Sequence, residues 1–168
     1  GDALVSGGAA SYGGNFFLGG SLKNGENPDM RWGTLILNGG TITGGKATGT
    51  YEAGANLGCG GNIAVCERGY VQINGGTVEN GEAKGVGGNI FMGNYPTAKL
   101  DITGGTVTGG KAVNGGNLYI SAGVTSKPDD ADYGQGYANI TGGTISNGEV
   151  TKTGANLQIE ANVTCANA

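Results

Sequence analysis

The chain has 168 residues, of which 39 are glycine and three are proline, and its formal net charge is −4. No run approaches the roughly 18 apolar residues that would indicate a membrane span, and no basic stretch could neutralise the phosphates of nucleic acid or an anionic membrane surface. We therefore expect a single domain over residues 1–168, with no nucleic-acid partner and no membrane insertion.

Two short signatures alternate strictly along the chain. One is Gly-Gly-Asn, once Gly-Ala-Asn, followed by a hydrophobic residue, and the other is Gly-Gly-Thr followed by Ile or Val. The asparagines are Asn15, Asn62, Asn89, Asn117 and Asn156. The threonines are Thr41, Thr77, Thr106 and Thr144. The shortest interval between two of these threonines is 29 residues, a length that suits one turn of a three-strand solenoid.

Hydrophobic columns accompany both signatures. They lie six and four positions before the threonine and one after it, and one and three positions after the asparagine. Glycine recurs every few residues and costs about 1 kcal/mol at an interior helical site, which excludes helical repeats. The sequence predicts an all-β parallel solenoid of about five coils, with Gly-Gly corners between short strands. Neither end shows a cap, so we expect uncapped ends and a fragment of a longer repeat protein.

The asparagine and threonine columns both have a structural interpretation. Stacked asparagine amides can hydrogen-bond from coil to coil, and threonines are suitable β-branched residues on a solvated strand. An ice-binding face is an alternative for the threonines, because Thr41–Thr43 and Thr106–Thr108 form Thr-x-Thr pairs. Glu79 and Ser146 interrupt that pattern in the other two coils.

A third column, two positions after the asparagine, faces outward by strand alternation. It reads Phe17, Ala64, Phe91, Tyr119 and Gln158. Inserted loops could cover these aromatic rings, or the rings could form a platform for a glycan or another protein. We include Phe91 and Tyr119 among the candidate ligand-binding residues.

Three insertions lengthen the coils, at residues 19–33, 48–59 and 122–136. The first and last fall at the same corner, so we expect them to lie on one side of the solenoid. Together they carry Asp29, Arg31 and Trp32, and Asp129, Asp130, Asp132 and Tyr133, with Tyr137 directly after the last insertion and Tyr95 between them in the third coil. Trp, Tyr and Asp side chains suit saccharide recognition, and these residues complete the candidate ligand-binding set.

The cluster of Asp129, Asp130 and Asp132 is also a candidate calcium site, because carboxylates are ligands that calcium prefers. Its alternative interpretation is an ordinary solvated turn. We predict no other cofactor.

The three cysteines have no zinc-like spacing and the chain has no histidine, so we expect the cysteines to be thiols rather than metal ligands. The acidic residues lie in loops rather than at matching strand positions, and without histidine no serine or cysteine triad can form. The sequence therefore favours the absence of enzymatic activity and assigns no catalytic residue.

The Gly-Gly-Thr-Ile/Val and Gly-Gly-Asn-Ile/Leu repeats, over roughly residues 3 to 165, resemble the degenerate β-helix repeats of pectate-lyase-like proteins. They are especially similar to the glycine-rich repeats of large bacterial surface proteins, adhesins and autotransporter passengers. This resemblance implies a right-handed parallel β-helix displayed outside the cell. The acidic constellation of pectin-active enzymes has no counterpart in this sequence, so the resemblance carries over no catalytic residue.

We therefore expect a structural or adhesive module of a secreted or cell-surface bacterial protein, which binds a glycan or a host protein through loops on one face. One alternative is a polysaccharide-active lyase or hydrolase, or its inactive remnant. A second alternative is the ice-binding solenoid. The open coil ends also predict end-to-end self-association.

Overall fold

The computed structural model of the chain describes residues 2–19, 33–50, 58–93, 97–121 and 137–160, together with the backbone of residues 164–165. Every regular element in these ranges is a β-strand, and all neighbouring strands pair in parallel. This part of the chain thus holds no helix that could cross a membrane.

The strands form four five-stranded sheets, which we call sheets A to D. Sheet A contains β1 (Leu4–Ser6), β5 (Thr41–Thr43), β9 (Thr77–Glu79), β13 (Thr106–Thr108) and β17 (Thr144–Ser146). Sheet B contains β2 (Ala9–Ala10), β6 (Lys46–Ala47), β10 (Glu82–Ala83), β14 (Lys111–Asn114) and β18 (Glu149–Thr153). Sheet C contains β3 (Phe16–Leu18), β7 (Ile63–Val65), β11 (Ile90–Met92), β15 (Leu118–Ile120) and β19 (Leu157–Ile159). Sheet D contains β4 (Gly33–Leu37), β8 (Gly69–Ile73), β12 (Lys99–Ile102), β16 (Tyr137–Ile140) and β20 (Thr164–Cys165).

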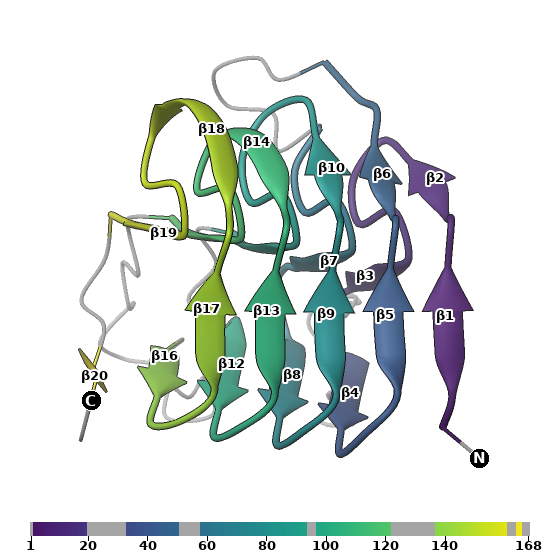
Figure 1. Cartoon of the computed structure of the whole chain (residues 1–168), viewed down its shortest axis with the longest axis vertical. Helices are drawn as coiled ribbons and strands as arrows, with labels where there is room; N and C mark the ends of the chain where they lie inside the picture. Colours follow the sequence, from purple (N-terminus) through teal and green to yellow (C-terminus); the bar gives the residue numbers. More distant parts are fainter. Residues whose placement is uncertain are drawn as a thin grey trace, which may run out of the picture.

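Each strand pairs with the strand four further along the chain, so the polypeptide passes through sheets A, B, C and D five times in the same order. We call each pass a coil. Figure 1 shows the five strands of sheet A side by side, with the two chain ends at opposite ends of the stack. This all-β stack of parallel strands is compatible with a parallel β-solenoid.

The prediction of three strands per coil is wrong, because every coil has a fourth strand in sheet B. In the first three coils this strand is two residues long. Two residues cannot display the alternation by which a strand is recognised in a sequence. Alternation within these strands therefore could not identify sheet B, although a column of alternating charge, Lys46, Glu82, Lys111 and Glu149, recurs five positions after the repeat threonine.

Glycine forms the corners between sheets D and A. The second glycine of each Gly-Gly-Thr signature has a φ between 75° and 83°, the left-handed region that only glycine enters without strain. These residues are Gly40, Gly76, Gly105 and Gly143. At the next corner, between sheets A and B, Asn80 and Asn147 both have a φ of 54°. Asparagine is one of the few other residues that tolerate this conformation. The predicted Gly-Gly corners are thus confirmed.

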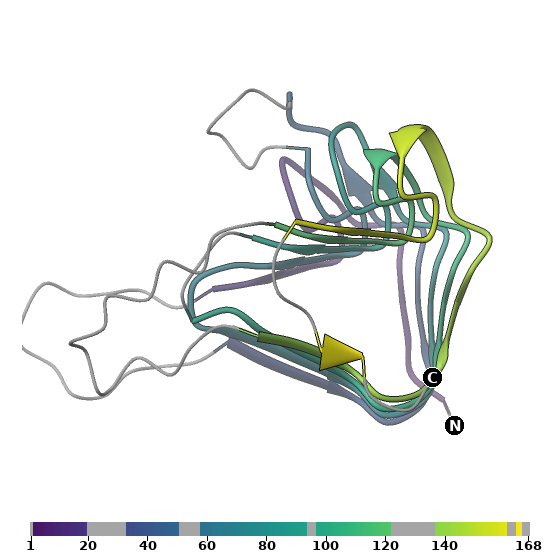
Figure 2. The same cartoon turned by 90° about the vertical axis from the view of Figure 1, so that its left-hand side faces the viewer.

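Sheets A, C and D enclose the main hydrophobic core, which runs the length of the stack (Figure 2). The predicted inward columns fill it, and each fully buried aliphatic side chain stabilises the fold by about 1.5 to 3 kcal/mol. Sheet A contributes Ile42, Val78, Val107 and Ile145. Sheet C contributes Ile63, Val65, Ile90, Met92, Leu118 and Ile120, and sheet D contributes Leu37, Val71, Ile73, Leu100, Ile102 and Ala138.

Sheet B lies outside this core and has its own small cluster of buried alanines, Ala47, Ala83 and Ala112. After sheet B the chain folds back over the outer face of sheet C (Figure 2). A second core fills the space between them, and it comprises Cys59, Ala64, Val86, Phe91 and Tyr119. Cys59 and Cys66 are thiols, and burial raises the pKa of the Cys59 thiol to about 11.

The five repeat asparagines form a continuous row of hydrogen bonds, which we call the asparagine ladder. The Nδ2 of each donates to the Oδ1 of the next, over 2.8, 2.7, 2.8 and 3.1 Å. Each Oδ1 also accepts a backbone N–H, from Gly8, Gly45, Gly81, Gly110 or Gly148. The first four Nδ2 groups donate further to the backbone carbonyls of Thr43, Glu79, Thr108 and Ser146. The three central amides are fully buried, and all their donors and acceptors are used.

Exposed ion pairs join neighbouring coils in sheet B. Lys46 Nζ lies 3.1 Å from Glu82 Oε2, and Lys111 Nζ lies 2.9 Å from Glu149 Oε2. Because these side chains are mostly exposed to solvent, the pairs add little stability. The alternation of sign favours the observed register, since a shift by one residue would separate each lysine from its glutamate.

Gly88 tests the close contact between coils. A Cβ at this position would clash with the carbonyl oxygen of Gly116 and the backbone nitrogen of Lys111. We expect Gly88→Ala to lower the free energy of unfolding by about 2 to 4 kcal/mol, measured by urea denaturation. A Cβ added to Gly39 meets nothing within 4 Å. Gly39→Ala should therefore be neutral or stabilise by up to about 1 kcal/mol, and equal losses for both variants would contradict this packing.

Asn89→Asp tests the asparagine ladder at its centre. The variant keeps the side-chain shape but turns an oxygen toward the acceptors Thr108 O and Asn117 Oδ1. We expect a loss of about 3 to 5 kcal/mol in the free energy of unfolding at neutral pH.

Burial beside two acceptors raises the pKa of the introduced carboxyl above its unfolded value. The deficit should therefore be smallest at pH values below the unfolded pKa and grow as the pH rises through the folded one. Asn38→Asp is the matched control, since Asn38 is exposed and its Oδ1 only accepts from Asn74. A deficit at Asn89 that does not depend on pH would refute the interpretation.

Candidate functional site

The outer face of sheet D carries two rows of polar and aromatic side chains. In one row Tyr70, Lys99 and Tyr137 lie on the successive strands β8, β12 and β16. In the other row Asp101 lies on β12 between Gln72 and Asn139. The register is unshifted across these three strands, so side chains of each row are neighbours.

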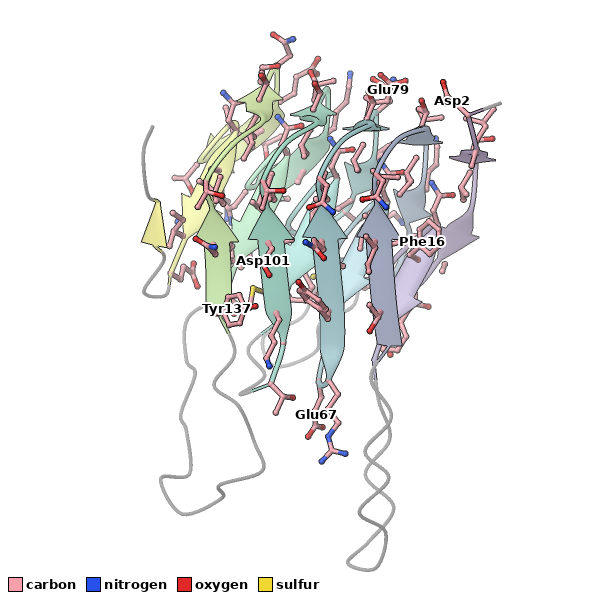
Figure 3. All side chains as sticks on the ribbon, turned by 90° about the horizontal axis from the view of Figure 1, so that it is seen from below. Asp2, Phe16, Glu67, Glu79, Asp101 and Tyr137 are labelled. Atoms are coloured by element: carbon pink, nitrogen blue, oxygen red, sulfur yellow. The ribbon has the colours of Figure 1, made fainter. Side chains whose placement is uncertain are left out.

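Two tyrosines converge on one carboxylate oxygen. The hydroxyl of Tyr70 donates to Asp101 Oδ2 over 2.9 Å, and that of Tyr137 donates to the same oxygen over 3.0 Å. Lys99 Nζ lies 5.9 Å from the ring centroid of Tyr137, within cation–π range. Figure 3 shows Asp101 and Tyr137 projecting from neighbouring strands on the outer face of the sheet. We call Tyr70, Lys99, Asp101 and Tyr137 the sheet D cluster.

The environment of the cluster keeps both phenols protonated. Partial burial, the hydrogen bond to Asp101 and the charge of that carboxylate raise the pKa of Tyr70 to about 12. The same causes, again with burial as the largest, raise the pKa of Tyr137. Both hydroxyls therefore remain donors at neutral and moderately alkaline pH.

The sheet D cluster suits binding better than catalysis. It offers two aromatic rings, one cation and one carboxylate, and Tyr137 is 41% exposed. Asp101 Oδ1 accepts no hydrogen bond within the described residues, so it can accept one from a ligand. Glycoside hydrolysis uses two carboxyl groups, whereas this cluster contains one. In the described part of the chain, no three His, Cys, Asp or Glu residues are grouped so that they could hold a metal ion.

Among the predicted ligand-binding residues, the structure places Tyr137 in this cluster. Phe91 and Tyr119 lie on the outer face of sheet C, as the alternation indicates, but they are only 2% and 5% exposed. Their rings stack with centroids 6.0 Å apart inside the second core, so neither presents a platform to a ligand. Phe17, in the same column, is 52% exposed and contacts Tyr12.

The remaining candidates lie outside the described residues, and the candidate calcium ligands are among them. These residues are Asp29, Arg31, Trp32, Tyr95, Asp129, Asp130, Asp132 and Tyr133. The strands on either side of residues 19–33 are β3 and β4, and those on either side of 122–136 are β15 and β16. Both segments thus connect sheet C to sheet D, and the second ends at Tyr137. Residues 48–59 connect sheet B to sheet C instead.

Sequence reasoning missed Tyr70, Lys99 and Asp101, although a signal was present. They lie seven or five positions before the repeat threonine, between and beside the two inward columns. Strand alternation therefore places these positions on the outer face together with Tyr137. The two columns read Thr34, Tyr70, Lys99, Tyr137 and Ile36, Gln72, Asp101, Asn139.

Comparison with known proteins identifies no relative: no family model, no curated protein and no solved structure matches this chain.

Titration of the tyrosines tests the cluster. Because the folded pKa of Tyr70 is raised above the ordinary value of about 10, its contribution to stability is complete below pH 10 and is lost as the pH rises toward about 12. We expect a late-titrating fraction in the ultraviolet absorbance of tyrosinate, which Asp101→Asn shifts to lower pH by removing the negative charge. Tyr70→Phe should remove part of this late fraction. If Asp101→Asn leaves the titration curve unchanged, the shared carboxylate is not the cause.

Proposed function

We propose that this chain is a right-handed parallel β-helix module of a secreted or cell-surface bacterial protein, and that it serves as a stiff adhesive element. The side of the stack where sheet C meets sheet D would bind a glycan or a host protein. The observation that carries this proposal is the sheet D cluster, which gathers partly exposed aromatic and charged groups beside that corner.

Several features support the architectural part of the proposal. The chain visits the four sheets in a constant order, and parallel strands of one sheet joined by a crossover are connected in a right-handed sense in about 98% of cases. The repeat signatures resemble those of bacterial surface proteins, which favours an extracellular location. A continuous core and the asparagine ladder run through all five coils, as a stiff spacer requires.

Three features support the adhesive part. Ligand-binding residues gather on connections and neighbouring strand ends that a rigid scaffold holds in place, and the two long segments from sheet C to sheet D end at strands β4 and β16. Aromatic side chains with a polar end are enriched on surfaces that bind partners. The single carboxylate of the cluster favours binding over hydrolysis.

A shortened variant tests this function. Replacing residues 122–135 by a single glutamate leaves three residues between β15 and β16, the length of the connection Cys66–Arg68 between the same two sheets in the second coil. This change should preserve the circular dichroism spectrum and the cooperative unfolding transition. We expect adherence to host cells and to immobilised glycans to fall by about tenfold or more, because the binding side is truncated. Replacing residues 51–57 by two glycines is the control, since that segment joins sheets B and C. Equal adherence of both variants and the unaltered protein would refute the assignment of the binding side.

A further inference from the structure

The sheet D cluster has the spacing of an extended binding surface. Tyr70, Lys99 and Tyr137 occupy successive rungs of one row, and parallel strands lie about 4.8 Å apart. The two tyrosines are therefore about 9.6 Å apart along the stack, with the charged groups between them. A short stretch of linked sugar rings can cover this span.

Aromatic rings and charged groups alternate along the sheet D cluster, an arrangement that suits the binding of sugars. A pyranose ring has an apolar face of C–H groups, which can lie on a tyrosine ring, and a rim of hydroxyls that donate and accept hydrogen bonds. Between the tyrosines, Lys99 can donate to a hydroxyl, and Asp101 Oδ1 can accept from one. Hydrogen bonds to charged groups are about twice as strong as those between neutral ones.

The cluster is ordered before a ligand arrives. Both tyrosine hydroxyls are held by Asp101 Oδ2, over 2.9 and 3.0 Å, which fixes each ring relative to the central carboxylate. Binding to side chains that are already ordered loses less conformational entropy than binding to mobile ones. The three strands beneath are held in register by their backbone ladder.

The charges select among ligands. Lys99 and Asp101 have opposite charges and lie two residues apart on strand β12. An anionic polymer would meet the carboxylate of Asp101 and a chain whose net charge is −4. The centre of a protein interface is usually depleted of Lys and Asp, whereas a sugar site uses such groups to orient hydroxyls.

We infer that the sheet D cluster binds a neutral, hydroxyl-rich glycan chain laid across strands β8, β12 and β16. Tyr70 and Tyr137 would contact sugar rings, and Lys99 and Asp101 would bind the hydroxyls between them. This inference rests on the proposed adhesive function and specifies its ligand and its residues.

Affinity electrophoresis of the intact chain tests it, with gels that contain neutral polysaccharides (glucan, xylan, mannan or galactan) or anionic polygalacturonate. Calorimetry with oligosaccharides of the best binder then gives the affinities. We expect a neutral glycan to bind, and each of the variants Tyr70→Ala, Tyr137→Ala and Asp101→Asn to weaken its binding by about tenfold. The double variant Thr106→Ala, Thr108→Ala changes the outer face of sheet A and is the control, which should bind normally.

Tyr137→Phe covers the case in which an alanine variant unfolds, because it keeps the ring and removes only the hydroxyl. It should weaken binding less than Tyr137→Ala. Unaltered neutral-glycan binding by folded variants of the cluster would overturn the inference, as would binding of polygalacturonate alone or of no polysaccharide. In each of these cases the loss of host-cell adherence on shortening residues 122–135 would still support the proposed function.

Discussion

The asparagine ladder is the interaction on which the rest of the structure depends. Each amide bonds the amide of the next coil and also the backbone at the corner between sheets A and B. The asparagine side chain thereby bridges the start and the end of the segment that runs from sheet A through sheet B to sheet C. It lies between that segment and the main core. If one coil shifted by a single residue relative to its neighbours, buried amide groups would lose their hydrogen-bond partners on both sides. The free-energy cost of these unpaired groups exceeds the gain from any single aliphatic contact.

Because the asparagine ladder fixes register, it also determines what the outer faces present. On sheet A the outer positions form rows of hydroxyls interrupted by Glu79, and on sheet B they alternate Lys with Glu. Sheet D differs, since aromatic and charged residues meet there on three adjacent strands. The convergence of two phenols on one carboxylate oxygen requires that these strands keep the same register. The candidate site is thus a consequence of buried residues that lie at another corner.

The sequence predicts the inward columns and the glycine corners because both recur in every coil at fixed offsets. Sheet B could not be predicted, since strands such as Lys46–Ala47 are too short to alternate. Alternation correctly places Phe91 on the outer side of its strand, but it cannot reveal that Cys59 and Val86, from other connections, cover that side. Of the candidate site, Tyr137 was found through its neighbouring insertion, while Tyr70 and Asp101 were missed because single polar residues on strands resemble ordinary solvated positions.

The sheet D cluster contributes little to holding the fold together, and this bears on its purpose. Its hydrogen bonds join partly exposed side chains on strands that the backbone ladder already pairs, and such cross-strand contacts contribute roughly 0.2 to 1 kcal/mol each. The buried amides at the opposite corner and the aliphatic rows inside would keep the same register without it. An exposed aromatic ring such as Tyr137 carries a cost in solubility that threonine at the same position, as in Thr34, avoids. Binding of the proposed glycan to these rings would explain why aromatic residues occupy two rungs of this row.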